Sequence, residues 1–191
     1  RLKLQLAMLN QKDLSKEMSK DIDEMEKMLN DYLQFAKNQA QENTSKIDLT
    51  LLLNSIKNQF ASEKLTIYSK EKIELEVRPS ALKRSFVNII QNGLTYGNNV
   101  IVNIQKGNNR ALITIEDDGD GYPRDVLSKI GEPYLSTNYP QEKSQTGLGL
   151  GLFIGKTLLE KNFASINCRN SKTRSGAEVI VRWKNRDLFN I

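Results

Sequence analysis

Hydrophobic positions change their spacing along the chain, and the change divides the chain into two parts. Between Met18 and Ala36 apolar residues recur at alternating intervals of four and three, with Lys, Glu and Asp between them. This spacing is typical of a coiled-coil seam, and a shorter apolar face precedes it within residues 2–9. We therefore predict a helical hairpin over residues 1–42 whose narrow apolar stripe pairs with a second copy in a dimeric four-helix bundle. The alternative is a hairpin that packs on its own domain.

Beyond a polar linker over residues 38–46, helical and strand periods alternate. Asp48 is expected to cap the first helix of this part. The pattern predicts helices over residues 49–62, 81–95 and 148–161 and strands over residues 64–68, 73–77, 100–105, 111–116, 165–169 and 177–183. We expect residues 48–191 to form an α+β domain, a two-layer sandwich in which helices cover one face of a mixed, mainly antiparallel sheet.

The helix over residues 81–95 carries candidate chemistry as well as core positions. Its apolar face is formed by Leu82, Phe86, Ile89, Ile90 and Leu94. This face leaves Asn88 and Asn92 one turn apart on another side of the helix. The neutral amide oxygen of Asn92 suits Mg²⁺, which prefers hard oxygen ligands. The alternative is an ordinary solvated asparagine.

A second candidate is Asp117, which follows the predicted strand 111–116 in the sequence Asp-Asp-Gly-Asp-Gly. An ionised carboxylate at this place can accept a hydrogen bond from an amino group, such as that of adenine. The alternative is a plain turn, because Asp-Gly pairs are ordinary turn formers.

A third candidate is the run of alternate glycines in residues 147–151, which leads into the apolar segment 150–159. Backbone N–H groups at such a helix start, with no Cβ beside them, can bind phosphate oxygens. The polar segment 136–146 before them is expected to act as a mobile lid. The run fits neither a Walker loop, whose spacing is one residue longer, nor a dinucleotide-binding turn, which needs a preceding strand. The alternative is a glycine-rich loop that enters an ordinary core helix.

Composition excludes several classes of function. The net charge of +5 is mild and spread along the chain without interleaved aromatic residues, so nucleic-acid binding is not indicated. No apolar run approaches the roughly 18 residues of a membrane span, and no signal peptide is visible. The single cysteine, Cys168, excludes an intrachain disulfide, and its place in an alternating strand predicts a buried structural thiol.

Taken in order, these segments resemble the ATP-binding domain of bacterial sensor histidine kinases, within the wider family shared with gyrase and MutL. Residues 88–97 (NIIQNGLTYG) resemble the family's asparagine box, and residues 117–121 (DDGDG) its first glycine box. Residues 131–134 (GEPY) are similar to the short box before the lid, and residues 147–151 (GLGLG) to the second glycine box. The resemblance covers residues 48–183 and implies a Bergerat-type ATP-binding fold.

The hairpin also resembles part of the family. Its segments DIDEM (residues 21–25) and LQFA (residues 33–36) are similar to the dimerisation and phosphoacceptor domain. The hairpin is similar to the osmosensing class, whereas GEPY and KTLLE (residues 156–160) are similar to the redox-sensing class. The subclass therefore stays open.

The resemblance implies that the domain binds ATP with Mg²⁺. It implies Asn92 as the Mg²⁺ ligand with Asn88 beside it, and Asp117 as the acceptor for the adenine amino group. Tyr96 is implied to flank the base or the sugar, the first-box glycines to shape the adenine pocket, and the second-box glycines to offer N–H groups to the phosphates. The implied nucleotide-binding residues are Asn88, Asn92, Tyr96, Asp117, Gly119, Gly121, Lys143, Thr146, Gly147, Leu148, Gly149, Leu150 and Gly151.

The sequence departs from the family pattern in three ways. Thr95 stands where a Lys or Arg often meets a phosphate, and Lys143 is the candidate substitute, with plain solvation as the alternative. Gly93 stands where the family usually has Ala, which costs up to about 1 kcal/mol of helix stability. The phosphoacceptor histidine is absent, since the chain contains no histidine. The chain begins at Arg1 inside a helical pattern without a cap, so we expect a fragment of a longer kinase, with a degenerate kinase as the alternative.

The function implied by the resemblance is that of a two-component protein-histidine kinase. The domain would transfer the γ-phosphate of ATP to a histidine outside this chain, for relay to an aspartate of a response regulator. The implied partners are a second copy, through the hairpin, and the response regulator, in the cytoplasmic part of a sensor anchored through segments outside this chain. A gyrase-like or MutL-like ATPase is disfavoured because Asn88 stands where those enzymes carry a Glu base. Two further hypotheses are a pseudokinase scaffold that dimerises through the hairpin and a serine kinase of the anti-sigma-factor type.

Overall fold

The computed structural model describes residues 18–19, 22–23, 26, 42–60, 63–107, 110–132 and 150–184. The chain forms two compact units, Arg1–Gln41 and Glu42–Ile191. The five described residues of the first unit are helical. The predicted hairpin turn, the four-helix bundle and the lid lie outside the described residues and stay predictions. Among the described residues, no helix has the length and hydrophobicity needed to cross a membrane.

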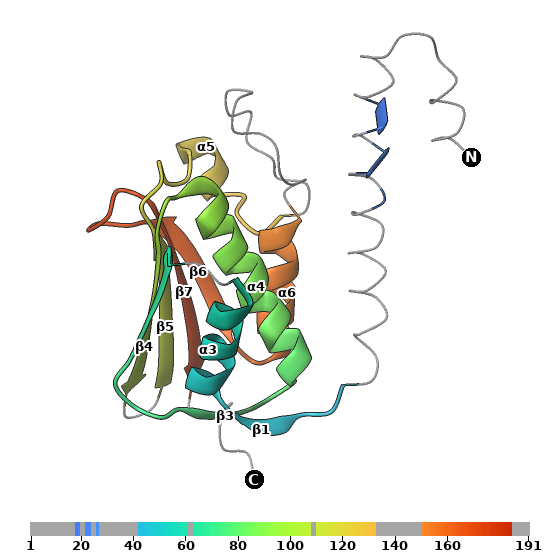
Figure 1. Cartoon of the computed structure of the whole chain (residues 1–191), viewed down its shortest axis with the longest axis vertical. Coiled ribbons are helices and arrows are strands. Elements are labelled where there is room, and N and C mark those ends of the chain that lie inside the picture. The colour runs from blue at the N-terminus through green and yellow to red at the C-terminus, as the bar shows by residue number, and fades with distance from the viewer. Residues whose placement is uncertain are drawn as a thin grey trace. The chain divides into compact units, whose positions relative to one another are not determined.

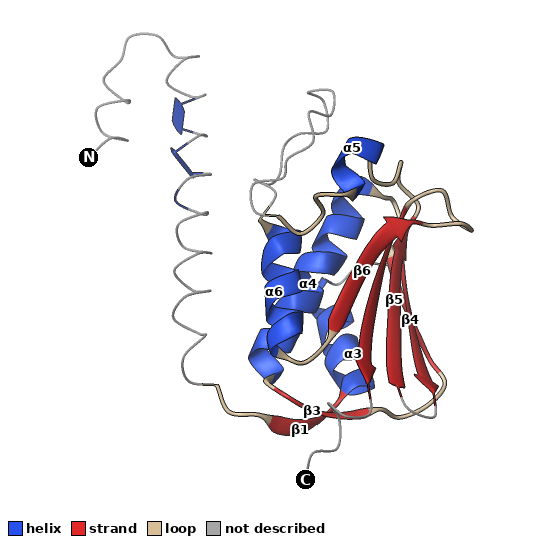
Figure 2. Cartoon of the chain, turned by 180° about the vertical axis from the view of Figure 1, so that it is seen from behind, coloured by secondary structure: helices blue, strands red, loops and turns tan. Residues whose placement is uncertain are grey.

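The second unit is a two-layer structure of helices on a sheet. Its elements are β1 (Ser45–Asp48), α3 (Leu49–Phe60), β2 (Leu65–Ser69), β3 (Glu74–Val77), α4 (Pro79–Tyr96), β4 (Val100–Gly107), β5 (Arg110–Asp117), α5 (Arg124–Leu127), α6 (Gly151–Lys161), β6 (Ser165–Asn170) and β7 (Ala177–Lys184). The main sheet has the strand order β2-β4-β5-β7-β6, with a parallel β2–β4 pair and three antiparallel pairs. Helices α3, α4 and α6 cover one face of this sheet (Figure 1 and Figure 2). The predicted α+β fold with a mainly antiparallel sheet is confirmed.

Strand β1 begins inside the predicted polar linker, and the linker prediction was wrong for those residues. β1 pairs antiparallel with β3 in a separate two-stranded sheet, where Ile47 lies opposite Leu75. An ion pair between Lys46 and Glu74 (2.7 Å) accompanies the pairing, and hydrogen bonds from Lys46 and Lys72 lower the pKa of Glu74 to about 2. Ile47 is the one apolar residue of the four, so the sequence showed no period of two.

Carboxylates hold the starts of two helices. Asp48 caps α3 as predicted, because its Oδ1 accepts from the backbone N–H groups two and three residues later (2.8 and 3.2 Å). Helix α4 begins at Pro79, two residues earlier than predicted. The Glu42 carboxylate binds the first turn of α4, because it accepts hydrogen bonds from the backbone N–H groups of Ser80 (2.6 Å) and Ala81 (3.0 Å). The chain that enters this unit is thus fixed to the helix that carries the two candidate asparagines.

The apolar face of α4 lies at the centre of the core. Of its predicted core residues, four are buried and the last is partly buried: Leu82, Phe86, Ile89, Ile90 and Leu94. The ring of Phe86 lies 6.5 Å from the ring of Trp183 on β7. Helix α6 approaches α4 closely at Gly155, where an added Cβ would lie 3.3 Å from Ile89 Cγ1. This close packing fixes the start of α6 beside the end of α4.

Helix α6 begins at Gly151, three residues after its predicted start, and Leu150 precedes it without a side-chain cap. Glycine costs about 1 kcal/mol relative to alanine inside a helix, so a run of alternate glycines disfavours an earlier start. The first N–H groups of any α-helix lack intrahelical partners. The last glycine of the second box therefore stands where such donors are available.

Cys168 on β6 is a half-buried free thiol. Burial raises the pKa of this thiol to about 11, so it stays protonated at neutral pH. The interpretation of Cys168 as a structural rather than reactive thiol agrees with this environment, although the residue is less buried than predicted.

Gly93 shows why the helix-stability argument from the sequence is incomplete. A Cβ added at this buried position would lie 2.8 Å from Val100 Cγ2 on β4. We expect Gly93→Ala to bring no net stabilisation, because this overlap offsets the helix-propensity gain of about 1 kcal/mol. In a protein that already carries Val100→Ala, Gly93→Ala should raise the free energy of unfolding by up to about 1 kcal/mol, because the overlapping Val100 methyl group is absent. Urea unfolding of the four variants measures the coupling, and equal effects in both backgrounds would contradict the assigned contact.

Candidate functional site

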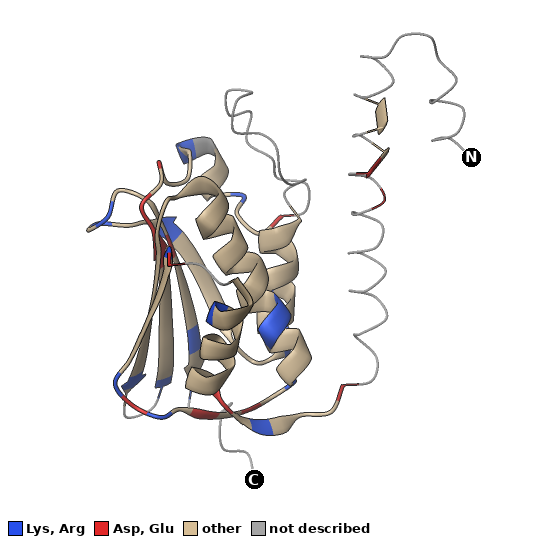
Figure 3. Cartoon of the chain, in the orientation of Figure 1, with Lys and Arg blue, Asp and Glu red and all other residues tan. Residues whose placement is uncertain are grey.

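Four segments meet at one end of the main sheet, the upper end in Figure 1. They are the end of β5, the end of α4, the start of α6 and the turn between β6 and β7. The packing is close: an added Cβ at Gly97 would lie 2.9 Å from Asp117 Cβ, and one at Gly119 would lie 2.5 Å from the carbonyl oxygen of Tyr96. Figure 3 shows acidic residues gathered at this end of the sheet beside basic residues of the β6–β7 turn. This is the only place where the predicted site residues of the described part converge.

Asp117 is the buried carboxylate of this site, with 8% of its surface exposed. Its Oδ1 accepts from the backbone N–H groups of Gly119 and Ala177, each at 3.0 Å. Desolvation raises the pKa of the carboxyl group above its usual value, and the two N–H donors oppose that shift. Within the described part of the chain both hydrogen bonds end on Oδ1, so Oδ2 retains its capacity to accept.

Asp118, the next residue, forms hydrogen bonds with the chain that follows α4. Its Oδ1 accepts from the N–H groups of Asn98 and Asn99 (both 2.7 Å), and its Oδ2 accepts from Asn99 Nδ2 (2.8 Å). These hydrogen bonds, that of the Asn99 side chain first, lower the pKa of Asp118. The residue thereby ties the chain after α4 to the end of β5 and fixes Tyr96 relative to Asp117.

The first-box glycines are required by this packing. Gly119 lies against the backbone of Tyr96, so no side chain fits there. Gly121 has a φ of +76°, a conformation that strongly favours glycine. Tyr96 itself is 49% exposed, and its backbone borders the loop at Gly119. The loop 119–121 and Tyr96 therefore form one wall.

Asn92 lies next to the start of α6. A Cβ added at Gly151 would lie 3.3 Å from Asn92 Oδ1 and 3.6 Å from its Nδ2. Asn88 and Asn92 are both half-buried, and in the described part of the chain neither amide makes a side-chain hydrogen bond. The structure thus brings the asparagine box and the last glycine of the second box together.

The structure describes the predicted phosphate-binding segment only from Leu150 onward. Lys143, Thr146, Gly147, Leu148 and Gly149 lie outside the described residues and stay predictions. Leu150 is half-buried just before α6. The described residues contain no cluster of three or more His, Cys, Asp or Glu side chains that could hold a metal ion. An oxygen from Asn92 is the candidate protein ligand for Mg²⁺, because a neutral amide fits an ion that keeps most of its water or is shared with phosphates.

The sequence interpretation assigned no role in the site to the turn between the last two strands, β6 and β7. Gly176 is buried, and an added Cβ would overlap the carbonyl and carboxylate oxygens of Asp117. Asn170, at the end of β6, forms hydrogen bonds with the backbone of Tyr122, the residue directly after the first glycine box. The polar run 170–176 (NSKTRSG) signalled a turn, and nothing in it signalled which residues it contacts.

Comparisons with known proteins give a family model and several relatives that match this chain. The model of the family described as "Histidine kinase-, DNA gyrase B-, and HSP90-like ATPase" matches residues 77–187. The chain is 28% identical over 184 residues to the sensor histidine kinase GtrS of Pseudomonas aeruginosa, covering 95% of this chain and 38% of that protein. It is 33% identical over 129 residues to the sensor histidine kinase RegB of Cereibacter sphaeroides, covering 56% of this chain and 28% of that protein. The chain thus spans well under half the length of these relatives.

A solved structure shows the same fold. The full-length ShkA structure in complex with AMPPNP matches with a TM-score of 0.66 and 18% identity, covering 92% of this chain and 39% of that chain. The family model covers more than half of the present sequence, and the relatives are sensor histidine kinases. The chain belongs to the histidine kinase-, DNA gyrase B- and HSP90-like ATPase family.

Proposed function

We propose that this chain is the ATP-binding part of a two-component protein-histidine kinase, which binds Mg-ATP and serves phosphoryl transfer to a histidine outside the chain. Membership in an ATPase family implies ATP binding. The observation that carries the proposal is the buried Asp117 carboxylate, which is held by two backbone N–H groups on one oxygen and can accept on the other. A buried acceptor of this kind suits the amino group of adenine.

The base end of the site follows from Asp117 and its neighbours. Oδ2 of Asp117 would accept from the adenine amino group, and the loop at Gly119 and Gly121 would leave room for the flat base because it carries no side chains there. Tyr96 would cover the base or the sugar with its exposed ring. A guanine presents a carbonyl oxygen where adenine presents the amino group, so the same carboxylate would reject it.

The phosphate end follows from α4 and α6. Asn92 would provide the Mg²⁺ ligand, Asn88 would lie near the phosphates, and the N–H groups around Gly151 would bind phosphate oxygens at the helix start. Lys143 and the residues from Thr146 to Leu150 are proposed to complete the phosphate site. Bound Mg²⁺ supplies neutralisation of phosphate charge, and phosphoryl transfer depends mainly on positioning and on such neutralisation.

The side chain at residue 88 favours transfer to a held acceptor over hydrolysis. Asn88 is an amide on the asparagine-box helix and cannot take a proton from an attacking water. The proposal includes the remaining partners: residues 1–42 would dimerise with a second copy, residues 48–191 would bind the nucleotide, and a response regulator would receive the phosphoryl group. The names of the relatives, sensor histidine kinases, support this assignment.

Calorimetric titration with a non-hydrolysable ATP analogue, with and without Mg²⁺, tests the proposal. We expect saturable binding that Mg²⁺ strengthens, and we expect Asn92→Ala to lose most of that strengthening because it removes the amide ligand. Gln91→Ala is the matched control, since Gln91 is an exposed amide on the same helix. A folded chain that shows no saturable binding would exclude the kinase assignment and leave the dimeric scaffold as the better hypothesis.

A further inference from the structure

The end of β6 and the turn between β6 and β7 contact both ends of the segment formed by the first glycine box and Tyr122, which follows it. Asn170 bonds to Tyr122, and Gly176 packs on Asp117. Arg174 Nη2 lies 3.9 Å from Asp118 Oδ2. The segment from Asp117 to Tyr122 is therefore bordered by one turn that lies about fifty residues later in the sequence.

The strongest of these contacts is the pair of hydrogen bonds made by Asn170. Its Oδ1 accepts from the backbone N–H of Tyr122 (2.6 Å), and its Nδ2 donates to the carbonyl oxygen of Tyr122 (2.9 Å). Both polar groups of that residue's backbone are thus satisfied by one side-chain amide. A Cβ added at Gly121 would lie 2.8 Å from Asn170 Oδ1, so the amide also lies against the loop itself.

The side chain of Tyr122 is held at the same strand. Burial raises the pKa of its phenol well above the usual value, and Cys168, two residues before Asn170, contributes to the shift. The loop is therefore held to β6 through the backbone of Tyr122, and the Tyr122 phenol is buried near the same strand. At the other end of the loop, Gly119 packs on the backbone of Tyr96. These two contacts fix the position of the loop relative to α4 and β5.

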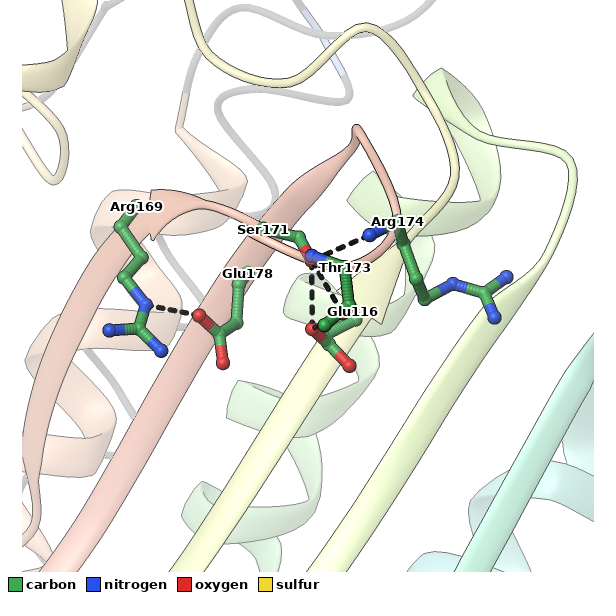
Figure 4. Close-up of polar contacts among 6 residues, drawn as sticks. All are labelled: Glu116, Arg169, Ser171, Thr173, Arg174 and Glu178. Carbon is green, nitrogen blue, oxygen red and sulfur yellow. Dashed lines mark hydrogen bonds and ion pairs between the residues drawn. The ribbon is translucent and has the colours of Figure 1, made fainter.

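The turn that follows Asn170 is itself braced, as Figure 4 shows. Ser171 Oγ donates to Glu116 Oε1 (2.9 Å) and accepts from the N–H groups of Thr173 and Arg174 (both 3.1 Å). Glu116 lies directly opposite Glu178 in the sheet, and two like charges in this position repel unless other groups stabilise them. The Ser171 hydroxyl stabilises Glu116 by a hydrogen bond, and Arg169 stabilises Glu178 by an ion pair. The bracing keeps the end of β6, and with it Asn170, in a fixed place.

We propose that Asn170 is a positioning residue for nucleotide recognition: by holding Tyr122 it fixes the loop at Gly119 and Gly121 as the wall of the base site. This inference rests on the proposed function, because it assigns the base end of the nucleotide to that wall. Asn170 touches no nucleotide itself and acts through the backbone of Tyr122. Its exposed position makes a purely structural requirement in the core an insufficient explanation.

The test compares the affinity of the chain for non-hydrolysable ATP and GTP analogues in three variants. Asn170→Ala removes both hydrogen bonds, and Asn170→Asp keeps the acceptor oxygen for the Tyr122 N–H and loses the donor. Asn167→Ala is the matched control, because Asn167 is an exposed asparagine on the same strand without a side-chain hydrogen bond among the described residues. Thermal unfolding of each variant is measured in parallel.

We expect Asn170→Ala to weaken binding of the ATP analogue by on the order of tenfold, with little change for the GTP analogue and a small change in Tm. The affinity of Asn170→Asp for the ATP analogue is expected to lie between that of Asn170→Ala and that of the unmodified chain. Asn167→Ala is expected to bind the analogue with unchanged affinity. Unchanged discrimination between the two analogues in Asn170→Ala would overturn the inference while leaving the proposed function intact. Absence of binding by the unmodified, folded chain would overturn both.

Discussion

Asp117→Asn is expected to weaken nucleotide binding by up to about a hundredfold or more while making the free domain more stable at neutral pH. The asparagine can keep Oδ1 as the acceptor for the N–H groups of Gly119 and Ala177. It replaces Oδ2 with an NH₂ group, which opposes the amino group of adenine instead of accepting from it. A lost hydrogen bond combined with two opposed donors costs roughly 1–3 kcal/mol, which corresponds to about five-fold to more than a hundred-fold in affinity.

The gain in stability follows from the direction of the pKa shift. Burial raises the pKa of Asp117 in the folded domain above the unfolded value of 3.8, so the folded state disfavours the ionised form. The resulting loss in the free energy of unfolding is absent below pH 3.8. It grows as the pH rises from there to the folded pKa and is constant at higher pH. The difference in the free energy of unfolding between Asp117→Asn and the unmodified domain should therefore increase from about pH 3 to about pH 7. Urea unfolding across this range measures the difference.

Asp118→Asn is the matched control, because the neighbouring carboxylate has the opposite shift. Hydrogen bonds from Asn99 and Asn98 lower its pKa, so its ionised form stabilises the folded domain, and this stability is lost as the pH falls through the folded pKa. We expect Asp118→Asn to lower stability at neutral pH. Equal pH profiles for the two variants, or tight nucleotide binding by Asp117→Asn, would contradict the roles assigned to the two residues.

The local periodicity of α4 and β5 explains which parts of the candidate site could be predicted from the sequence. The apolar spacing of Leu82, Phe86 and Ile89 sets the face of α4 that packs on the sheet, and this orientation alone determines where Asn92 can lie. Likewise, the alternation along residues 111–116 placed Asp117 at a strand end. These are short-range patterns, in which each residue's environment follows from neighbours within one or two turns.

The remaining part of the site depends on contacts between distant segments. Asn170 and Tyr122 are 48 residues apart, and Glu42 bonds to the start of α4 from 38 and 39 residues away. No period in either segment specifies the partner, since polar residues in a turn are equally compatible with plain solvation. Gly93 illustrates the same limit: the sequence showed the loss in helix propensity, and only the neighbouring strand showed the contact with Val100 that a larger residue would disturb.

Gly176→Ala has the second large expected effect, because it acts on Asp117 from outside every recognised motif. The position is buried, and the new Cβ would overlap both the carbonyl oxygen and Oδ1 of Asp117. The new Cβ is attached to the backbone of residue 176 and overlaps the backbone of Asp117, so the turn must move away from β5. This movement would weaken the hydrogen bond from the Ala177 N–H to Asp117 Oδ1. We expect a loss of about 1–3 kcal/mol in the free energy of unfolding, and a loss of nucleotide affinity of at least about tenfold.

Gly107→Ala separates this contact from the general effect of replacing a glycine in the sheet. At Gly107 the closest atoms to an added Cβ are Cγ and Nε of the Arg110 side chain (3.1 and 3.3 Å), which can move aside. This variant should unfold and bind nucleotide like the unmodified chain. If Gly176→Ala behaves like Gly107→Ala in both measurements, the β6–β7 turn does not position Asp117. If Gly176→Ala loses affinity at temperatures where it remains folded, the turn positions Asp117, the carboxylate that we propose recognises the base.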